Sequence, residues 1–292
     1  MFRGTFTALV TPFGGEGIDV AALEKLLEAQ FAGGVTGVVA VGTTGESPTL
    51  THEEREIVIR KCVEMSKGHG AVLAGTGSYS TRDAIEATKR AEQMGVDGAL
   101  VVSPYYNKPS QEGLFRHFKA VADATSLPLV LYNIPGRCGV DINADTVVRL
   151  AEACRNIVSI KEASGSVERV SELRGRLPET FTILSGDDSL TLPFMAVGAV
   201  GVVSVASNLI PAEISALVQA FASGDVAAAQ KLHRRIFPLL KDLFIEPNPV
   251  PIKTTLEWKG RMSGACRLPL CEMTEANKTR LRKTLEAFEQ SK

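Results

Sequence analysis

The residue in this chain whose type and position most clearly favour a chemical role is a lysine. It ends a short apolar segment within residues 157–163. The β-branched and apolar residues before Lys161 are typical of a strand that is buried on both faces. Burial disfavours the charged form of a lysine, and a lysine that is neutral near pH 7 attacks carbonyl groups to form a Schiff base. The segment by itself is also compatible with a structural lysine that extends to solvent and pairs with Glu162. The strands and loops predicted around Lys161 distinguish between these two interpretations.

The composition indicates an ordinary globular protein of 292 residues, with 45% hydrophobic residues, 22% charged residues and a net charge of −1. Such a balance gives no field that would attract nucleic acid or an anionic membrane. No apolar run approaches the roughly 18 residues that span a bilayer, and no signal peptide is evident. The five cysteines are scattered without C-x-x-C spacing, which favours reduced thiols over disulfides or a zinc site. We expect a soluble, cytoplasmic protein.

The order of strand-like and helical segments predicts an α/β fold, a (β/α)8 TIM barrel. Apolar runs predict eight strands, at residues 5–10, 37–41, 71–74, 99–102, 129–132, 157–160, 181–184 and 201–205. Segments with helical period lie between them, and the capping-box pattern that begins at Thr51 opens one that ends near Ser66. Eight alternating units are typical of a parallel barrel. A doubly wound open sheet is the competing architecture, but its G-x-G-x-x-G motif after the first strand is absent.

Beyond Gly224 the pattern changes to helices without strands. We expect helices at residues 225–244, 252–259 and 274–290, separated by links that contain proline or glycine. The chain is therefore expected to consist of a catalytic barrel, residues 1–224, and a C-terminal extension of three helices, residues 225–292.

In a (β/α)8 barrel, chemistry is found at the C-terminal ends of the strands. Hydroxyl groups, phenols and the lysine gather at these ends, whereas the four histidines do not. His52, His69, His117 and His233 fall on predicted helices or a loop at a helix end. This distribution argues against a His-rich metal site, so we expect neither a metal nor a cofactor. Ser185-Gly186 and Ser207-Asn208 are only weak versions of the glycine-rich turns that bind phosphate in such barrels, so we expect no phosphate site. We interpret Asp187 and Asp188 as loop or helix-cap residues.

Three features of the strand ends favour chemistry on a carbonyl compound that carries carboxylates. The G-T-T-G-E turn at residues 42–46 offers hydroxyls and backbone N–H groups as a nest for a carboxylate. Tyr132 ends the strand before that of Lys161, and a phenol there can transfer protons during imine formation. Arg137 offers a bidentate fork for a second carboxylate. Each feature also has an ordinary structural explanation: a glycine turn, a tyrosine bonded to backbone and a surface ion pair.

Taken together, these motifs resemble those of the dihydrodipicolinate synthase family, in order and over essentially the whole chain. The motifs are G-T-T-G-E (42–46), S-P-Y-Y-N-K-P-S-Q-E-G (103–113), Y-N-I-P-G-R (132–137), I-K-E-A (160–163), S-G-D-D (185–188) and E-P-N-P-V-P-I-K (246–253). The turn and the Tyr–Lys pair are shared across the wider superfamily of pyruvate-dependent lyases. Y-Y-N-K-P and the arginine after Y-N-I-P are closer to the synthase family itself.

The resemblance implies a reaction in the diaminopimelate route to lysine. Lys161 would form a Schiff base with pyruvate, and the derived enamine would attack L-aspartate 4-semialdehyde to give 4-hydroxy-tetrahydrodipicolinate. The resemblance assigns a proton relay to Tyr132, Thr43 and Tyr106, with Tyr106 reaching into the site of a neighbouring subunit. Catalysis would then depend on assembly, and the family is usually a homotetramer built from two tight dimers.

The resemblance also assigns residues that bind the substrates. Thr44, together with Thr43, would hold the carboxylate of pyruvate, and Arg137 would receive the carboxylate of the semialdehyde. Gly186 and the carbonyl group of Val203 would lie at the pocket. No cofactor, nucleic acid or membrane takes part in this scheme.

The chain departs from the pattern of family members that L-lysine inhibits. Ser47, His52 and Tyr105 match that pattern. The pattern has a small residue, a second histidine and an asparagine at the positions of Pro48, Arg55 and Tyr79. Because an arginine adds positive charge beside the ammonium group of the ligand, we expect weak or absent inhibition by L-lysine.

Two other functions compete with this interpretation. An aldolase of the same superfamily, such as N-acetylneuraminate lyase, would keep Lys161, Tyr132 and the 42–46 turn but usually lacks equivalents of Tyr106 and Arg137. A non-catalytic barrel retained for binding would be expected to have lost at least one of these groups by drift. We expect no role for Cys138.

Overall fold

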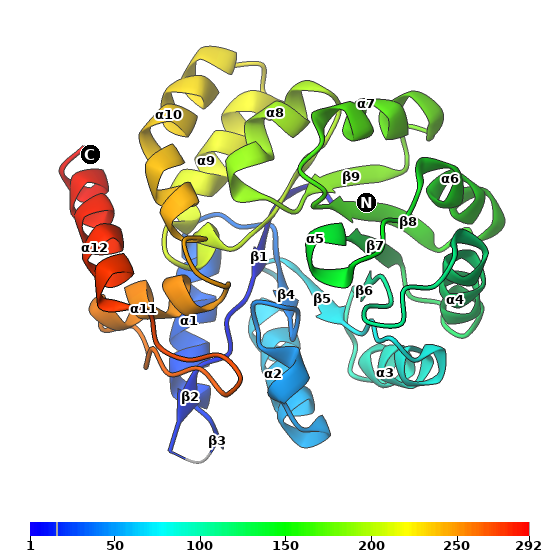
Figure 1. The fold of residues 1–292 in the computed structure, drawn as a ribbon, viewed down its shortest axis with the longest axis horizontal. Coiled ribbons are helices and arrows are strands. Elements are labelled where there is room, and N and C mark those ends of the chain that lie inside the picture. The colour runs from blue at the N-terminus through cyan, green and yellow to red at the C-terminus, as the bar shows by residue number, and fades with distance from the viewer. Residues whose placement is uncertain (16, 292) are drawn as a thin grey trace.

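Eight parallel strands form a closed barrel at the centre of the molecule (Figure 1). The structure is a computed structural model that describes residues 1–15 and 17–291. The strands are β1 (Gly4–Ala8), β4 (Gly37–Ala40), β5 (Ala71–Gly75), β6 (Gly98–Val102), β7 (Leu129–Asn133), β8 (Ile157–Glu162), β9 (Thr182–Ser185) and β10 (Gly201–Ser204). Each strand pairs with the next one along the chain, and β1 pairs with β10 to close the ring. The predicted barrel is confirmed, and the open sheet is excluded.

Helices alternate with the strands and surround the barrel (Figure 1). They are α1 (Val20–Ala32), α2 (His52–Ser66), α3 (Thr81–Gln93), α4 (Gln111–Asp123), α6 (Ala144–Ala153), α7 (Val167–Arg176), α8 (Thr191–Ala196) and α9 (Pro211–Ala222). The capping box at the start of α2 is confirmed, because Thr51 and Glu54 each accept the backbone N–H of the other. The side chain of Asn143, at the start of α6, makes no capping hydrogen bond. Gln111 of α4 satisfies this helix end instead, accepting from the Asn143 N–H and the Thr146 hydroxyl.

The elements that the sequence does not predict are short and follow strands. They are a hairpin of β2 (Phe13–Gly14) and β3 (Gly17–Ile18), the single turn α5 (Pro135–Cys138), and the 3-10 turns η1 (Ser47–Thr49), η2 (Asp188–Leu190) and η3 (Ala206–Asn208). Segments of two to four residues are too short to display a hydrophobic period, which explains why periodicity does not reveal them. Strand β8 also extends two residues beyond its predicted end, because Lys161 and Glu162 continue the pairing with β7 and β9.

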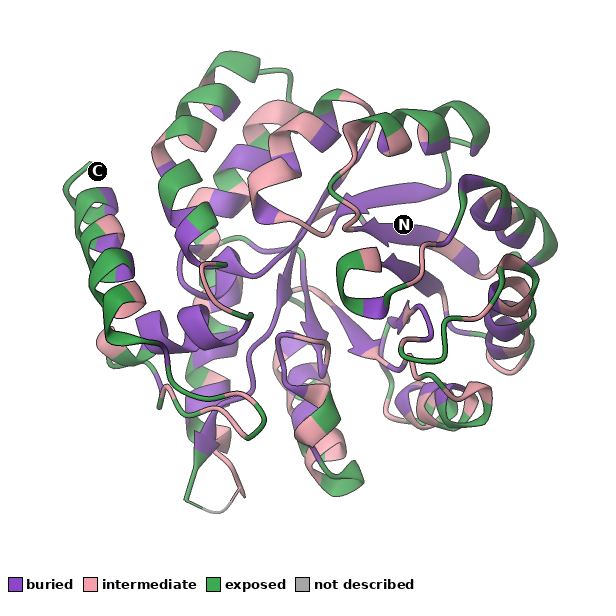
Figure 2. Cartoon of the chain, viewed as in Figure 1, coloured by how far each residue is buried: buried purple, intermediate pink, exposed green. Residues whose placement is uncertain are grey.

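The C-terminal extension consists of α10 (Val226–Asp242), α11 (Val250–Trp258) and α12 (Glu275–Gln290). Helix α10 packs against α9 of the barrel and against α12. Ile236 of α10 and Leu281 of α12 belong to the same hydrophobic cluster as the barrel strands. Buried residues are concentrated on the strands and the inner helix faces in Figure 2. The extension and the barrel therefore share one core. Among the described residues, no helix is long and apolar enough to cross a membrane.

Candidate active site

Lys161 and Tyr132 lie side by side at the C-terminal ends of adjacent strands. The two residues are partners in the parallel register of β8 and β7. Lys161 Nζ lies 4.0 Å from the centre of the Tyr132 ring. Both residues are buried, each with only 5% of its surface exposed. The structure therefore places an amine and a phenol within reach of one small molecule.

Burial lowers the pKa of Lys161 to about 7. The negative charge of Asp188 raises this pKa and the positive charge of Arg137 lowers it, both by less than the effect of burial. Near neutral pH, a substantial fraction of Lys161 is therefore the uncharged nucleophile. The alternative of a solvent-exposed lysine paired with Glu162 does not hold. Glu162 binds Arg169 instead, with 2.8 Å between Arg169 Nε and Glu162 Oε2.

Tyr132 is connected to the turn that follows β4. Burial raises the pKa of its phenol to about 12, and a hydrogen bond with the Thr43 side chain opposes this increase. The phenol therefore remains protonated at neutral pH and can donate as well as accept a proton. A cavity of about 90 Å³ borders Thr43, Tyr132 and Tyr105.

The G-T-T-G-E turn is fixed by contacts with the C-terminal extension. The N–H of Gly45 donates to the carbonyl of Gly42, and Glu46 adopts a left-handed conformation with φ of +54°. The Glu46 carboxylate is held 2.6 Å from Lys253 Nζ of α11. A left-handed conformation in a residue other than glycine is unfavourable unless its surroundings hold it. The buried ion pair with Lys253 supplies such a constraint.

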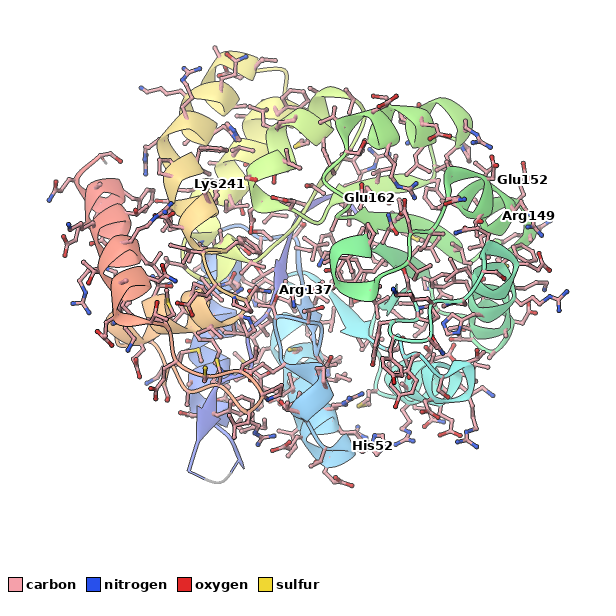
Figure 3. The ribbon with its side chains drawn as sticks, in the orientation of Figure 1. His52, Arg137, Arg149, Glu152, Glu162 and Lys241 are labelled. Carbon is pink, nitrogen blue, oxygen red and sulfur yellow. The ribbon has the colours of Figure 1, made fainter. Side chains whose placement is uncertain are left out.

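Arg137 lies on α5, five residues beyond Tyr132, and is exposed. Figure 3 shows Arg137 close to the centre of the barrel, whereas His52 lies at its periphery on α2. The Arg137 Nη2 group donates to the backbone carbonyl of Asn248, at 3.2 Å. The remaining N–H groups of its fork are available for a carboxylate.

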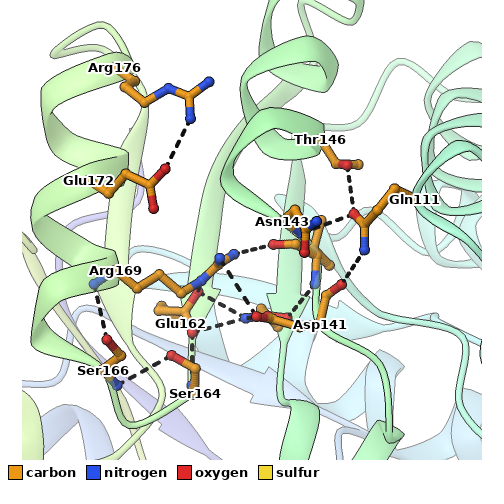
Figure 4. Close-up of polar contacts among 12 residues, drawn as sticks. Gln111, Asp141, Asn143, Thr146, Glu162, Ser164, Ser166, Arg169, Glu172 and Arg176 are labelled. Atoms are coloured by element: carbon orange, nitrogen blue, oxygen red, sulfur yellow. Dashed lines mark hydrogen bonds and ion pairs between the residues drawn. The ribbon is translucent and has the colours of Figure 1, made fainter.

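A polar network lies at the ends of β7 and β8, and Figure 4 shows Glu162, Arg169 and Asp141 within it. Asn133 and Glu162, the residues that follow Tyr132 and Lys161, belong to this network. Asn133 Nδ2 donates to Glu162 Oε1 at 3.0 Å and to Asp141 Oδ1 at 2.6 Å. Because successive side chains of a strand point to opposite faces, these groups lie on the outer side of the barrel wall. This network is not predicted from the sequence, although the polar residue directly after Tyr132 and after Lys161 is a usable signal.

The comparisons with known proteins agree with this geometry. The model of the dihydrodipicolinate synthetase family matches residues 1–288. The 4-hydroxy-tetrahydrodipicolinate synthase of Endomicrobium trichonymphae is 51% identical and covers 99% of each chain. That of Sorangium cellulosum is 52% identical over 98% of this chain and 96% of the relative. This chain belongs to the dihydrodipicolinate synthetase family.

Solved structures of family members superpose closely on the chain. The structure of the synthase from Methylacidiphilum fumariolicum SolV has a TM-score of 0.98 at 55% identity, covering 99% of this chain and 97% of the other. The synthase structure from Aquifex aeolicus has a TM-score of 0.97 at 47% identity, over 99% and 98% of the two chains. The resemblance to the family that the motifs indicate is therefore confirmed over the whole barrel and its extension.

In this family member, the segment after β9 contributes more to the site than the sequence predicts. A Cβ atom on Gly186 would lie 3.1 Å from Lys161 Cε, so the glycine leaves room for the lysine. Asp187 caps η2 as expected, accepting from the Ser189 N–H. Asp188, the first residue of η2, is buried, and its carboxylate binds the N–H groups at the start of η3. Asp188 Oδ2 accepts the N–H groups of Val205 and Ala206, at 2.9 and 3.0 Å, and the charge acts on Lys161.

The remaining predicted residues lie in different surroundings. Val203 is buried on β10, whereas Tyr106 is 90% exposed and lies outside the buried cluster of its own chain. A separate cavity of about 520 Å³ borders His52, Arg55 and Tyr105. Ser47 lies on the adjoining smaller cavity that also borders Thr43, so the two hollows are neighbours.

The described residues also bear on metal-binding clusters and on thiols. Among the described residues, no cluster of three or more histidine, cysteine, aspartate or glutamate side chains is arranged to hold a metal ion. All five cysteines are free, and Cys138 is buried, with its pKa raised to about 11 by burial. A thiol with a raised pKa is a poor nucleophile at neutral pH.

Proposed function

We propose that this chain condenses pyruvate with L-aspartate 4-semialdehyde to give 4-hydroxy-tetrahydrodipicolinate, a lyase-class reaction in the diaminopimelate route to lysine. The observation that carries the proposal is the buried Lys161, with a pKa near 7, in contact with the Tyr132 ring. The curated relatives with about half of their residues identical bear the name of this synthase. Arg137 and Tyr106, which the competing aldolases usually lack, favour the synthase over a pyruvate-releasing aldolase.

The reaction begins at the Lys161 amine. Its neutral form attacks the ketone carbon of pyruvate, and loss of water from the carbinolamine leaves a cationic imine. Tyr132 and Thr43, joined by a hydrogen bond, transfer the protons that convert the carbinolamine oxygen into the departing water. Loss of a methyl proton then gives the enamine, which is the carbon nucleophile.

The second half of the reaction builds the ring. The enamine carbon attacks the aldehyde of the semialdehyde and regenerates a cationic imine on Lys161. The amino group of the semialdehyde attacks this imine carbon, and the ring closes as the Lys161 amine is released. Bond formation and proton transfer account for every step, so the scheme needs no oxidant or reductant.

We assign the two carboxylates to opposite ends of this cluster. Thr43, Thr44 and the N–H groups of their turn bind the carboxylate of pyruvate, with Gly186 and Val203 lining the pocket near Lys161. Arg137 binds the carboxylate of the semialdehyde through its free N–H groups.

The test is chemical trapping of the imine. The protein is treated with sodium borohydride in the presence of pyruvate, and the modified peptide is identified by mass spectrometry. A reduced pyruvyl adduct on Lys161, absent from the Lys161→Ala variant, is expected, followed by turnover with aspartate semialdehyde among the aldehydes screened. A folded wild-type protein that forms no adduct would refute the Schiff-base mechanism and favour a binding protein.

We further propose a homotetramer, a dimer of dimers, in which Tyr106 completes the proton relay of a neighbouring subunit. The exposure of Tyr106 supports this arrangement, because a phenol facing solvent has no access to its own buried Lys161. The assembly has to be measured, since one solved relative with 37% identity is described as a monomeric variant. Analytical ultracentrifugation measures the oligomeric state. Mixing inactive Tyr106→Phe and Lys161→Ala subunits should restore activity only if Tyr106 acts across the interface.

We also propose that the protein works in the cytoplasm. Its five cysteines are free in the structure, and unpaired thiols persist in a reducing compartment. Cell fractionation with an antibody against the chain would test this location.

A further inference from the structure

We propose that Asn248, in the C-terminal extension, is a positioning residue that fixes Thr44 and Arg137 relative to each other and so holds the two carboxylate-binding groups at a set separation. The inference deepens the proposed function and rests on it, because the two carboxylates belong to the two substrates. Its consequence is that the helices after the barrel complete the substrate site.

The contacts of Asn248 connect two different strand ends. Its side-chain Nδ2 donates to the hydroxyl of Thr44 at 2.9 Å, and its backbone carbonyl accepts from Arg137 Nη2 at 3.2 Å. Thr44 follows β4 and Arg137 follows β7, so one residue joins both sides of the barrel opening. Asn248 itself is buried, with 6% of its surface exposed. A hydrogen bond sheltered from water is stronger and more directional than one at the surface.

The direction of the Thr44 hydrogen bond determines what its hydroxyl can do. A hydroxyl has one hydrogen to donate and two lone pairs to accept with. Because Asn248 Nδ2 supplies the hydrogen in this bond, the hydrogen of Thr44 remains available for an anion in the turn. Asn248 therefore keeps Thr44 as a donor, which is the form a carboxylate requires.

The carbonyl of Asn248 acts on the mobility of Arg137. An exposed arginine has many rotamers, and fixing them upon binding costs free energy. The bond from Arg137 Nη2 removes part of this freedom before the substrate arrives. The guanidinium keeps further N–H groups for a bidentate contact.

Asn248 is itself held by the same turn that it supports. Five residues later, Lys253 forms the buried ion pair with Glu46, the last residue of that turn, and donates to the Thr11 carbonyl at 3.0 Å. The extension thus contacts the turn at both Thr44 and Glu46. This double attachment gives Asn248 a defined position from which to orient Arg137.

The experiment compares Asn248→Ala, Asn248→Asp and a matched control, Thr254→Val. Among residues 1–15 and 17–291, the Thr254 hydroxyl has its hydrogen bond with the Val250 carbonyl of its own helix α11. Its removal therefore tests the effect of deleting a buried polar group from the same segment. Steady-state kinetics give KM for each substrate and kcat. Borohydride trapping at saturating pyruvate gives adduct formation, and thermal unfolding gives Tm.

Asn248→Ala is expected to raise KM for pyruvate and for aspartate semialdehyde by about tenfold each, because each carboxylate-binding group loses its support. The value of kcat and the adduct yield at saturating pyruvate should stay within about threefold of wild type. Asn248→Asp has nearly the same shape but accepts the Thr44 hydrogen and adds a negative charge. It should raise both KM values by about 100-fold. Thr254→Val should change neither KM.

Three results would overturn the inference. In the first, Asn248→Ala leaves both KM values unchanged and lowers Tm by the same amount as Thr254→Val. In the second, Asn248→Ala raises only one of the two KM values. In the third, Asn248→Ala lowers kcat and leaves KM unchanged. If Asn248→Ala does not fold, the Asn248→Asp variant alone decides between the same outcomes. Wild-type protein that forms no pyruvate adduct would instead refute the proposed function, and the two failures are thus distinguished.

Discussion

Lys253 Nζ and Glu46 Oε1 lie 2.6 Å apart in the protein interior, although the two residues are 207 positions apart in the chain. Neither side chain has more than 1% of its surface exposed. The second carboxylate oxygen of Glu46 accepts the N–H of Arg267 at 2.9 Å. The ion pair therefore connects the turn at residues 42–46 of the barrel to the C-terminal extension, and its loss should affect both.

Breaking this ion pair from one side is predicted to destabilise the protein strongly. Glu46→Gln or Lys253→Met leaves an uncompensated buried charge or polar group, which costs about 3–5 kcal/mol. We expect Tm to fall by roughly 10 °C in each variant. The double variant should be less destabilised than the sum of the two, because both remove the same interaction.

Thermal unfolding measured by calorimetry gives these values. Asp123→Asn, which breaks the exposed pair with Lys119, is the control and should leave Tm unchanged. A Tm of Glu46→Gln equal to that of wild type would show that the turn does not depend on the ion pair.

The rate of imine formation should follow the ionisation of Lys161. Its pKa is lowered to about 7, so the reactive neutral amine predominates above that pH. We predict that kcat/KM for pyruvate rises through pH 7 and reaches a plateau above pH 8. Asp188→Asn removes a charge that raises the pKa and should move the midpoint to lower pH, whereas Arg137→Met should move it to higher pH. A midpoint near 10 in wild type would contradict the role of burial.

The same lowered pKa predicts that Lys161 destabilises the folded protein while it supplies the reactive amine. Between pH 7 and the ordinary value of 10.5, the unfolded lysine binds a proton that the folded one does not. Wild-type stability therefore rises with pH in this window, and the cost of burying Lys161 is largest below pH 7. Lys161→Met should abolish turnover and raise Tm by about 5 °C at pH 6, with the gain shrinking toward pH 10. Calorimetry at both pH values measures this gain, and an equal gain at the two would contradict the linkage.

Removal of the Tyr132 hydroxyl should slow the reaction without disturbing the barrel. Tyr132→Phe keeps the ring beside Lys161 but loses the hydrogen bond to Thr43. We expect kcat to fall by roughly 100-fold or more, with little change in Tm. Thr43→Val should produce a similar loss, and the double variant should be hardly worse than either, because the two groups act as one relay. Additive losses would show that the hydroxyls work independently.

The cavity beside the site should respond weakly to L-lysine. Arg55 lies on this cavity, and its Nη2 donates to the Ser47 carbonyl at 2.6 Å. A fixed guanidinium disfavours the ammonium group of lysine. Activity is therefore expected to persist at millimolar lysine, and Arg55→His should increase the inhibition. Micromolar inhibition of wild type would contradict this prediction; one solved relative, from Cyanidioschyzon merolae at 43% identity, has lysine bound.

The barrel architecture and the proximity of Lys161 to Tyr132 could be predicted from the sequence. Eight apolar runs alternating with capped helical segments specify the barrel, since each strand and helix displays its period within its own residues. Lys161 and Tyr132 could be located because each ends an apolar run, and parallel strands bring such ends to one side of a barrel. Only local patterns and a general rule of topology were needed.

The contacts and the electrostatics of these groups depend on tertiary packing. The register between β7 and β8 places Lys161 Nζ 4.0 Å from the centre of the Tyr132 ring, and burial lowers the pKa of Lys161. From the sequence, Asp188 is expected to be a loop or cap residue. In the structure, packing after β9 buries its carboxylate, which accepts the N–H of Val205. The hydrogen bond from Asn248 to Thr44 joins residues 204 positions apart. Such contacts depend on the packing of distant segments, which leaves no periodic trace in the sequence around either partner.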